Sequence, residues 1–174
     1  VSMAERYLKR HGAARILKRP QRRHEPAQTE TTLKQLARLR RAVSVSAGTP
    51  MLAMWDDDPE SRTFASLPHV SSIASRGPLT PDHAIRTKRI PVILGTRMEG
   101  GIARFAAAYR TYFTRHARGT RLTCLDPAPR WAVWPSHGRV AFGRTLTDAQ
   151  IVSDITRQTM RAIQWAEVLG GWKT

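Results

Sequence analysis

The 174-residue sequence has few of the features that mark secreted or membrane-bound proteins. It holds one cysteine, Cys124, which excludes an internal disulfide framework and is typical of a reducing cytosol. No apolar run is long enough to span a membrane, and no signal peptide pattern is present. We therefore expect a cytoplasmic protein without a membrane partner, whose length suits one domain with its own core.

Several catalytic patterns are also missing. No Gly-rich dinucleotide fingerprint follows a predicted strand, and none of the 3 tyrosines has a lysine four residues later. No Gly-x-Ser-x-Gly nucleophile elbow occurs, and Cys124 has no neighbouring histidine in the sequence. The 6 histidines include no His-x-His pair. The residues in hand therefore assign neither hydride transfer nor nucleophilic catalysis to this chain.

Acidic residues are scarce, since 13 Asp and Glu stand against 29 Lys and Arg, a net charge of +16. Such a balance attracts nucleic acid, anionic lipid or phosphorylated ligands. The cations are spread among structured segments, however, and the basic stretch 15–29 contains no aromatic residue for base stacking. A GC-rich genome also favours arginine, and we prefer that explanation to nucleic-acid binding.

The strongest local signals lie in the last third of the chain. The apolar segments Arg130–Trp134 and Arg139–Phe142 flank the turn Pro135–Gly138 and predict a β-hairpin. Thr145 stands three residues before Asp148, the spacing of a helix N-cap with an acidic partner. The following residues then share one helical face: Ala149, Val152, Ile155, Thr159, Ile163, Ala166 and Leu169.

Upstream, the hydrophobic pattern predicts several further elements. It predicts helices over 31–47 and 102–116, one or two short helices within 64–75, strands over 51–55, 90–94 and 121–125, and a loop over 95–101. Pro91 indicates the start of its strand or an edge position. Strands mixed with helices predict an α/β fold in layers, with a mixed sheet because of the final hairpin.

The N-terminal region reads differently. Residues 1–14 resemble the end of a helix, and residues 15–29 are polar, basic and interrupted by Pro20 and Pro26, which predicts a linker. The chain starts within a helical pattern without Met and stops soon after another helix, so we expect a fragment of a longer protein. The expected organisation is a helix end over 1–14, a linker over 15–29 and an α/β domain over 30–174.

Two segments suggest ligand chemistry. The run Asp56–Asp58 offers oxygen ligands for a hard cation, but we prefer a turn that leads into a helix with Pro59 at its first position. Thr80 is placed to cap a helix beginning at Pro81, followed closely by three cations. We therefore predict a phosphate site formed by Thr80, Arg86, Lys88 and Arg89, with solvated cations as the equal alternative.

Three stretches resemble known families. The closing one, "WAVWPSHGRVAFGRTLTDAQIVSDITRQTMRAIQWAEVLGG", resembles the end of a class II aldolase/adducin-type domain. The run "RGPLTPDHAIRTKRIPVIL" resembles the middle of bifunctional rhamnulose-1-phosphate aldolase/alcohol dehydrogenases, and the opening "AERYL" is similar to the last helix of a preceding aldolase domain. The resemblance implies a three-layer fold, with a mixed sheet of about four to five strands flanked by helices, after an N-terminal helical and linker segment.

The resemblance also implies chemistry. Class II aldolases use histidine-bound zinc to stabilise an enediolate-like intermediate. His137 matches a zinc-ligand position in their Asn-His-Gly-like turn, although Ser136 replaces the asparagine, and His83 is the other histidine in a motif-like setting. Catalytic zinc needs three protein ligands, and two candidates are too few. We therefore prefer a turn histidine with local hydrogen bonds for His137.

The expected function follows from this shortage of ligands. The chain resembles a degenerate aldolase-like middle domain of a bifunctional sugar-phosphate aldolase/short-chain dehydrogenase. That resemblance implies zinc in the intact protein, NAD in a separate dehydrogenase portion, adjoining aldolase and dehydrogenase domains, and a homo-oligomer. The alternative is a non-catalytic basic interaction module, either a nucleic-acid binder or an adducin-like scaffold.

Overall fold

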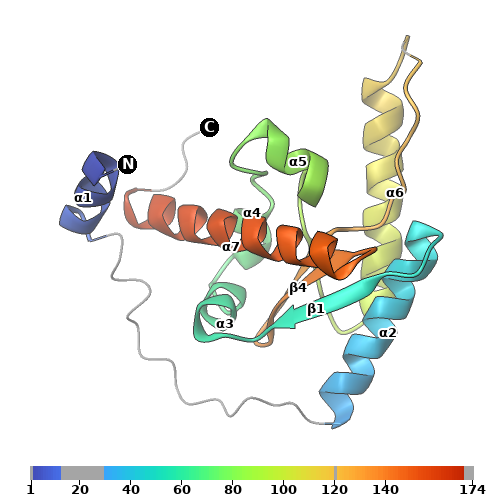
Figure 1. The fold of residues 1–174 in the computed structure, drawn as a ribbon, viewed down its shortest axis with the longest axis horizontal. Helices are drawn as coiled ribbons and strands as arrows, with labels where there is room; N and C mark the ends of the chain where they lie inside the picture. Colours follow the sequence, from blue (N-terminus) through green and yellow to red (C-terminus); the bar gives the residue numbers. More distant parts are fainter. Residues whose placement is uncertain (1, 13–29, 120, 171–174) are drawn as a thin grey trace.

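The computed structural model describes residues 2–12, 30–119 and 121–170. Helix α1 (Ser2–Arg10) occupies the predicted N-terminal helical segment. The predicted linker over 15–29 lies outside the described residues. The remaining elements form an α/β body around one sheet, shown as a ribbon in Figure 1.

The sheet is mixed and has the strand order β1-β4-β3-β2. Its strands are β1 (Leu52–Asp56), β4 (Gly138–Gly143), β3 (Trp131–Trp134) and β2 (Val92–Ile93). Strand β4 runs antiparallel to both β1 and β3, whereas β2 is parallel to β3. The predicted closing hairpin is confirmed, with Trp134 opposite Gly138 at its turn.

Helices cover both faces of the sheet and give three layers. Helices α2 (Glu30–Ala47) and α6 (Met98–His116) pack on one face, and α3 (Pro59–Ala65), α4 (Val70–Ala74) and α7 (Leu146–Val168) pack on the other. Helix α5 (Pro81–Thr87) lies against α7. The predicted three-layer α/β architecture is therefore confirmed. None of the helices within the described residues is both long and apolar enough to cross a membrane.

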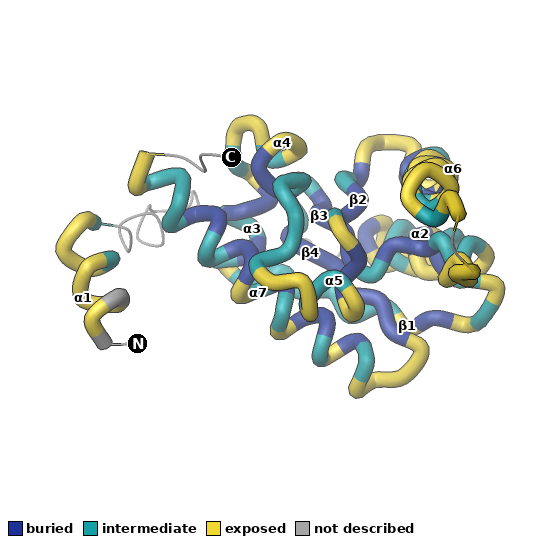
Figure 2. Tube along the Cα trace, turned by 90° about the horizontal axis from the view of Figure 1, so that it is seen from above, coloured by how far each residue is buried: buried dark blue, intermediate teal, exposed yellow. Residues whose placement is uncertain are grey.

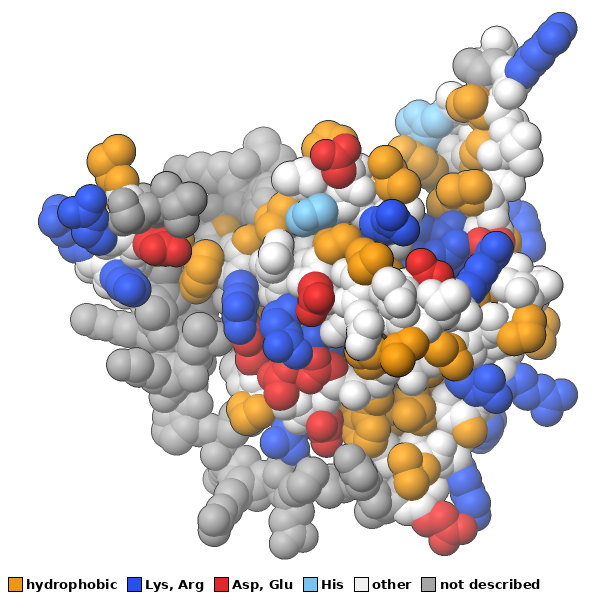
Figure 3. Space-filling model, in the orientation of Figure 1, with side chains coloured by type: hydrophobic (Ala, Val, Ile, Leu, Met, Phe, Trp, Pro, Cys, Tyr) orange, Lys and Arg blue, Asp and Glu red, His pale blue; other side chains and the backbone are white. Residues whose placement is uncertain are grey.

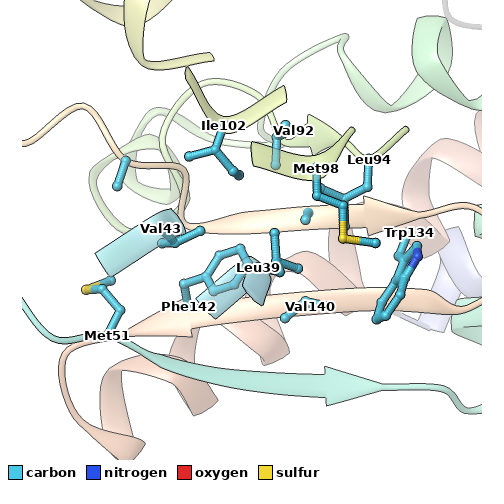
Figure 4. Packing of buried hydrophobic residues seen from close by; sticks show 12 residues of the cluster. Leu39, Val43, Met51, Val92, Leu94, Met98, Ile102, Trp134, Val140 and Phe142 are labelled. Atoms are coloured by element: carbon cyan, nitrogen blue, oxygen red, sulfur yellow. The ribbon is translucent and has the colours of Figure 1, made fainter. Parts of the chain in front are cut away.

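Alternation along β4 divides the core in two. Val140 and Phe142 face α2 and α6, whereas Ala141 faces α7, because successive strand side chains point to opposite sides. Figure 4 shows the first cluster, in which Leu39 and Val43 from α2 lie near Phe142. In Figure 2 the buried residues of β3 and β4 lie in the middle of the body, and exposed residues lie on the outer turns of the helices around them.

Helix α7 begins with the predicted capping arrangement. The Thr145 hydroxyl accepts from the Asp148 N–H at 3.1 Å and donates to the Asp148 carboxylate at 2.9 Å. Four of the predicted face residues are buried: Ala149, Val152, Thr159 and Ile163. Ile155 and Ala166 are half-buried and Leu169 is exposed, whereas Ser153 and Thr156 are buried. The buried face of α7 is therefore shifted and more polar than predicted.

Two local predictions are wrong at their boundaries. The loop predicted over 95–101 contains the start of α6 at Met98, because packing buries Met98, Gly101 and Ile102 despite the low helix propensity of glycine. The strand predicted over 90–94 shortens to Val92–Ile93. Its edge position agrees with the prediction from Pro91.

The strand predicted over 121–125 is wrong. Residues 121–129 have no regular structure, and the Leu122 and Leu125 side chains are 64% and 63% exposed. A strand needs a hydrogen-bonding neighbour, and this segment joins none of the strands in the sheet. The sheet of the described region therefore has four strands, within the predicted range.

Candidate functional site

The predicted helix cap at Thr80 is present in the structure. The Thr80 hydroxyl accepts from the His83 N–H at 3.4 Å, and Pro81 is the first residue of α5. Helix α5 has 7 residues and ends at Thr87. Thr80 and Lys88 consequently lie at opposite ends of a helix about 10 Å long.

Lys88 is buried beside α6. Its ammonium donates to the carbonyl oxygen of Asp126 and lies 3.6 Å from the centre of the Tyr109 ring. Burial, together with the positive charge of Arg130, lowers the pKa of Lys88 to about 8. The Lys88 backbone has φ +60° and ψ −179°, a region that residues other than glycine rarely occupy. Its contacts position the 121–129 segment against α6.

The structure separates the four residues of the predicted phosphate set. Arg89 lies over the Tyr112 ring at 5.4 Å, next to Lys88 along the chain. Arg86 instead lines a pocket of about 170 Å³ beside the start of α7. The phosphate prediction for Thr80, Arg86, Lys88 and Arg89 stays a prediction, and the geometry divides these residues among the two ends of α5 and the pocket.

The pocket brings in two further arginines. Its lining residues are Met51, Ile85, Arg86, Arg130, Phe142, Gly143, Arg144, Asp148 and Val152. Arg130 pairs with both carboxylate oxygens of Asp126, at 2.9 and 2.5 Å. Burial of Asp126 opposes its ionisation, but the hydrogen bonds and charge of Arg130 lower its pKa. Sequence reasoning misses Arg130 and Arg144, because their segments read only as a strand start and a turn.

The acidic run forms ion pairs with arginines. Asp58 caps α3 by accepting from the Ser61 N–H at 2.9 Å, and Pro59 is the first residue of α3. The preferred interpretation of this run as a turn and helix start is therefore confirmed. Figure 3 shows acidic side chains gathered beside arginines between α3 and α7.

Arginines of α7 and β4 neutralise these carboxylates. Arg157 reaches Asp56 at 2.7 Å, and Arg161 holds Glu60 with two bonds of 2.6 and 2.8 Å. Arg139 from β4, which is 1% exposed, also pairs with Asp56. A metal ion would have to displace these guanidinium groups, so the run acts here as a structural ion-pair network.

The two candidate metal ligands lie on different elements. His137, in the turn between β3 and β4, stacks on Trp134 at 4.4 Å, and its Nδ1 lies 2.9 Å from the Pro135 carbonyl oxygen. Its carbonyl oxygen accepts from the Trp55 indole N–H at 2.9 Å. His83 lies in the first turn of α5, where its Nδ1 is buried without a hydrogen-bond partner.

The donor set does not fit a catalytic zinc centre. Among residues 2–12, 30–119 and 121–170, no three His, Cys, Asp or Glu side chains are grouped so that they could hold a metal ion. Catalytic zinc sites use three protein ligands and keep one open position. His137 and His83 stay a prediction as metal ligands, and no catalytic step is assigned to them.

Comparisons with known proteins agree with the architecture. The family model described as "Aldolase class II, second domain" matches residues 30–174. One curated relative, the "Uncharacterized oxidoreductase YuxG" of Bacillus subtilis (strain 168), is 24% identical over 140 residues, which cover 73% of this chain. The chain spans only 20% of the length of that relative. No solved structure matches the chain.

Proposed function

Because this chain belongs to the family of class II aldolase second domains, we propose that it is an aldolase-like domain of a longer sugar-phosphate enzyme. The longer enzyme joins a sugar-phosphate aldolase to a short-chain dehydrogenase, acts in carbohydrate metabolism in the cytoplasm, and assembles as a homo-oligomer. The chain contributes a layered scaffold and an anion site in which Arg86, one of the predicted residues, takes part. The catalytic zinc and the NAD lie in other parts of that enzyme.

One observation carries this proposal. The family match spans residues 30–174 and so includes the whole layered body. The relative supports a longer enzyme, since the chain corresponds to 20% of its length and its name describes an oxidoreductase. An oxidoreductase part outside the matched region agrees with the absence of a dinucleotide fingerprint in this chain.

The donor set supports a non-catalytic role for the domain by itself. Nδ1 of His137 lies against a backbone carbonyl, and its ring packs on Trp134. His83 is on α5, a separate element on which no further metal ligand is grouped with it among the described residues. Zinc chemistry in the longer enzyme then depends on ligands from the aldolase part that adjoins this domain.

Zinc binding tests the proposal directly. Equilibrium dialysis of the 174-residue chain should show no tight zinc binding, and His137→Ala should change nothing. His116→Ala, which alters an exposed histidine at the end of α6, is the matched control. Tight binding that disappears in His137→Ala and persists in His116→Ala would show that this domain holds its own metal centre, and the proposal would then fail.

A groove favours an interaction module as the second candidate. It has a volume of about 670 Å³, lies between α2 and α6, and is lined by Arg38, Arg41 and Arg110 around an apolar floor that includes Ile102 and Ala106. Tight binding of arbitrary duplex DNA with a steep salt dependence would favour this module over the enzyme domain. Weak binding with a shallow dependence would favour the enzyme domain.

A further inference from the structure

The pocket beside the start of α7 has rigid apolar walls. Met51, Phe142 and Val152 line it, and each is buried in the body of the domain. Its opening is bordered by Ile85 and Arg86 of α5, which are exposed. The pocket is thus a fixed hollow in the folded body with charged groups around it.

Three arginines from segments far apart in the sequence line this pocket. Arg86 comes from α5, Arg130 from the residue before β3, and Arg144 from the turn between β4 and α7. Like charges repel one another, so their convergence is unfavourable unless anions lie among them. Figure 3 shows cationic side chains over the region between α5 and the start of α7.

The anions of the protein neutralise only part of this charge. Asp126 engages Arg130 with both oxygens but reaches Arg144 only at 3.6 Å, and the Arg144 side chain is 60% exposed. Arg86 has no ion pair within the described part of the chain. Asp148 is the single acidic residue in the lining, and its carboxylate accepts from the Thr145 hydroxyl. Two guanidinium groups therefore retain donors for a ligand.

The chemistry of the lining identifies the ligand. Guanidinium groups bind phosphate and carboxylate oxygens through paired N–H donors, and two nearly free groups match a dianion better than a monoanion. A volume of about 170 Å³ lies below the roughly 300–1,000 Å³ of pockets that take drug-sized ligands, which favours a small ligand such as a phosphate or a small phosphate ester. Asp148 repels a phosphate placed beside it, so the phosphate belongs on the arginine side of the pocket, and a hydroxyl group of the ligand is able to donate to Asp148.

We propose that the Arg86–Arg130–Arg144 pocket binds a single phosphoryl dianion, either inorganic phosphate or the phosphate of a small ester. The assignment differs from the set Thr80, Arg86, Lys88 and Arg89, because Lys88 is engaged with Asp126 and Tyr109 and Arg89 lies over Tyr112. The choice of a small ester rests on the proposed function. The binding of phosphate itself rests only on the geometry of the pocket.

Calorimetric titration of the 174-residue chain with inorganic phosphate at fixed ionic strength tests the site. Arg86→Gln and Arg144→Gln should each weaken binding about tenfold or more, since each removes a charge-assisted hydrogen bond. Both side chains are largely exposed, and circular dichroism checks that the variants fold. Arg115→Gln, which alters an exposed arginine at the end of α6, should leave the affinity unchanged.

The controls separate a built site from general attraction to a basic protein. Equal weakening in Arg115→Gln, or unchanged binding in Arg86→Gln and Arg144→Gln, would overturn the proposal. Tighter binding of glycerol 3-phosphate than of inorganic phosphate would identify an ester as the ligand, and equal or weaker binding would identify free phosphate. Zinc content does not depend on these arginines, so this site and the proposed function can fail independently.

Discussion

Arg139 and Asp56 are direct partners across the antiparallel pair formed by β4 and β1, and their side chains form an ion pair beneath α7. Arg139 also donates to the Ser61 hydroxyl at 3.1 Å and to Thr156 at 2.7 Å. Its guanidinium is thus bonded on several sides within the core. On α7, the Thr156 hydroxyl and the Ser153 carbonyl oxygen accept two of these bonds, the second at 2.5 Å.

Replacing Arg139 should destabilise the fold strongly. Arg139→Met removes a buried cation together with its hydrogen bonds and leaves Asp56 with Arg157 as its remaining arginine partner, which should lower the free energy of unfolding by about 3 kcal/mol or more. Arg161→Met is the matched control, since Arg161 is 43% exposed and its pair with Glu60 should contribute under about 1 kcal/mol. Urea denaturation of both variants measures the difference. Equal losses would contradict a special role for the buried arginine.

Acid should weaken the same network through Asp56. Burial opposes the ionisation of Asp56, but hydrogen bonds, including that of Arg157, and the charge of Arg139 hold its pKa well below its ordinary value of 3.8. A lowered pKa contributes stability above the unfolded pKa, and this contribution is lost as the pH falls through the folded value. We expect the stability difference between the wild type and Asp56→Asn to shrink below about pH 4.

Denaturation series at pH 6, 4 and 3 measure this difference. Burial and the neighbouring Asp56 raise the pKa of Asp58, which acts in the opposite direction, so comparison with Asp56→Asn measures the contribution of Asp56 together with its effect on Asp58. A difference that stays constant over the series would show that Asp56 is not the group that titrates.

Local signals predict α7 and the closing hairpin well, whereas the network beneath them cannot be predicted in this way. Thr145 and Asp148 lie within one helical turn, so their spacing alone identifies the cap. In the sequence, Arg139 is only the first residue of the segment predicted as the second strand of the hairpin. Only the assembled sheet brings it beside Asp56, 83 residues away in the sequence.

Long-range packing also explains why the strand predicted over 121–125 and the predicted phosphate set differ from the structure. The pattern of residues 121–125 predicts a strand, but this segment pairs with neither of the outer strands of the sheet, β1 and β2. Proximity in the sequence groups Arg86 with Lys88 and Arg89, whereas the helical turn of α5 and the unusual backbone at Lys88 direct these side chains to different neighbours. Spacing in the sequence identifies partners within one helical turn, whereas partners far apart in the sequence are determined by long-range packing.

Glycine at position 88 should be less harmful than alanine. Both Lys88→Gly and Lys88→Ala remove the contacts with Asp126 and Tyr109, but only glycine relaxes the backbone at φ +60°. We expect the glycine variant to be more stable than the alanine variant by about 1 kcal/mol or more. Thermal unfolding measures the order. At Arg89, which is not among the residues with positive φ, Arg89→Ala should be more stable than Arg89→Gly. A glycine variant that is more stable than the alanine variant at both positions would argue against strain at Lys88.

Gly143 allows the start of α7 to approach the end of β4, so its replacement should disturb both the helix and the arginine pocket. A Cβ atom at Gly143 would lie 2.3 Å from the Ala149 backbone nitrogen, and backbone atoms cannot move aside as a flexible side chain does. Gly143→Ala should lower the free energy of unfolding by about 1–3 kcal/mol, the usual effect of overpacking. It should also weaken phosphate binding, because Gly143 and Arg144 line the pocket.

The control is Gly95→Ala, where a Cβ meets nothing within 4 Å and φ lies outside the left-handed region. Alanine there should leave stability unchanged or raise it by under about 1 kcal/mol, because it restricts the unfolded chain. Thermal denaturation of the two variants, each followed by phosphate titration, separates the effects. Loss of stability in both would mean that glycine serves only local flexibility. Loss of stability in Gly143→Ala alone, together with weaker phosphate binding, would show that both properties depend on the close approach of β4 and α7.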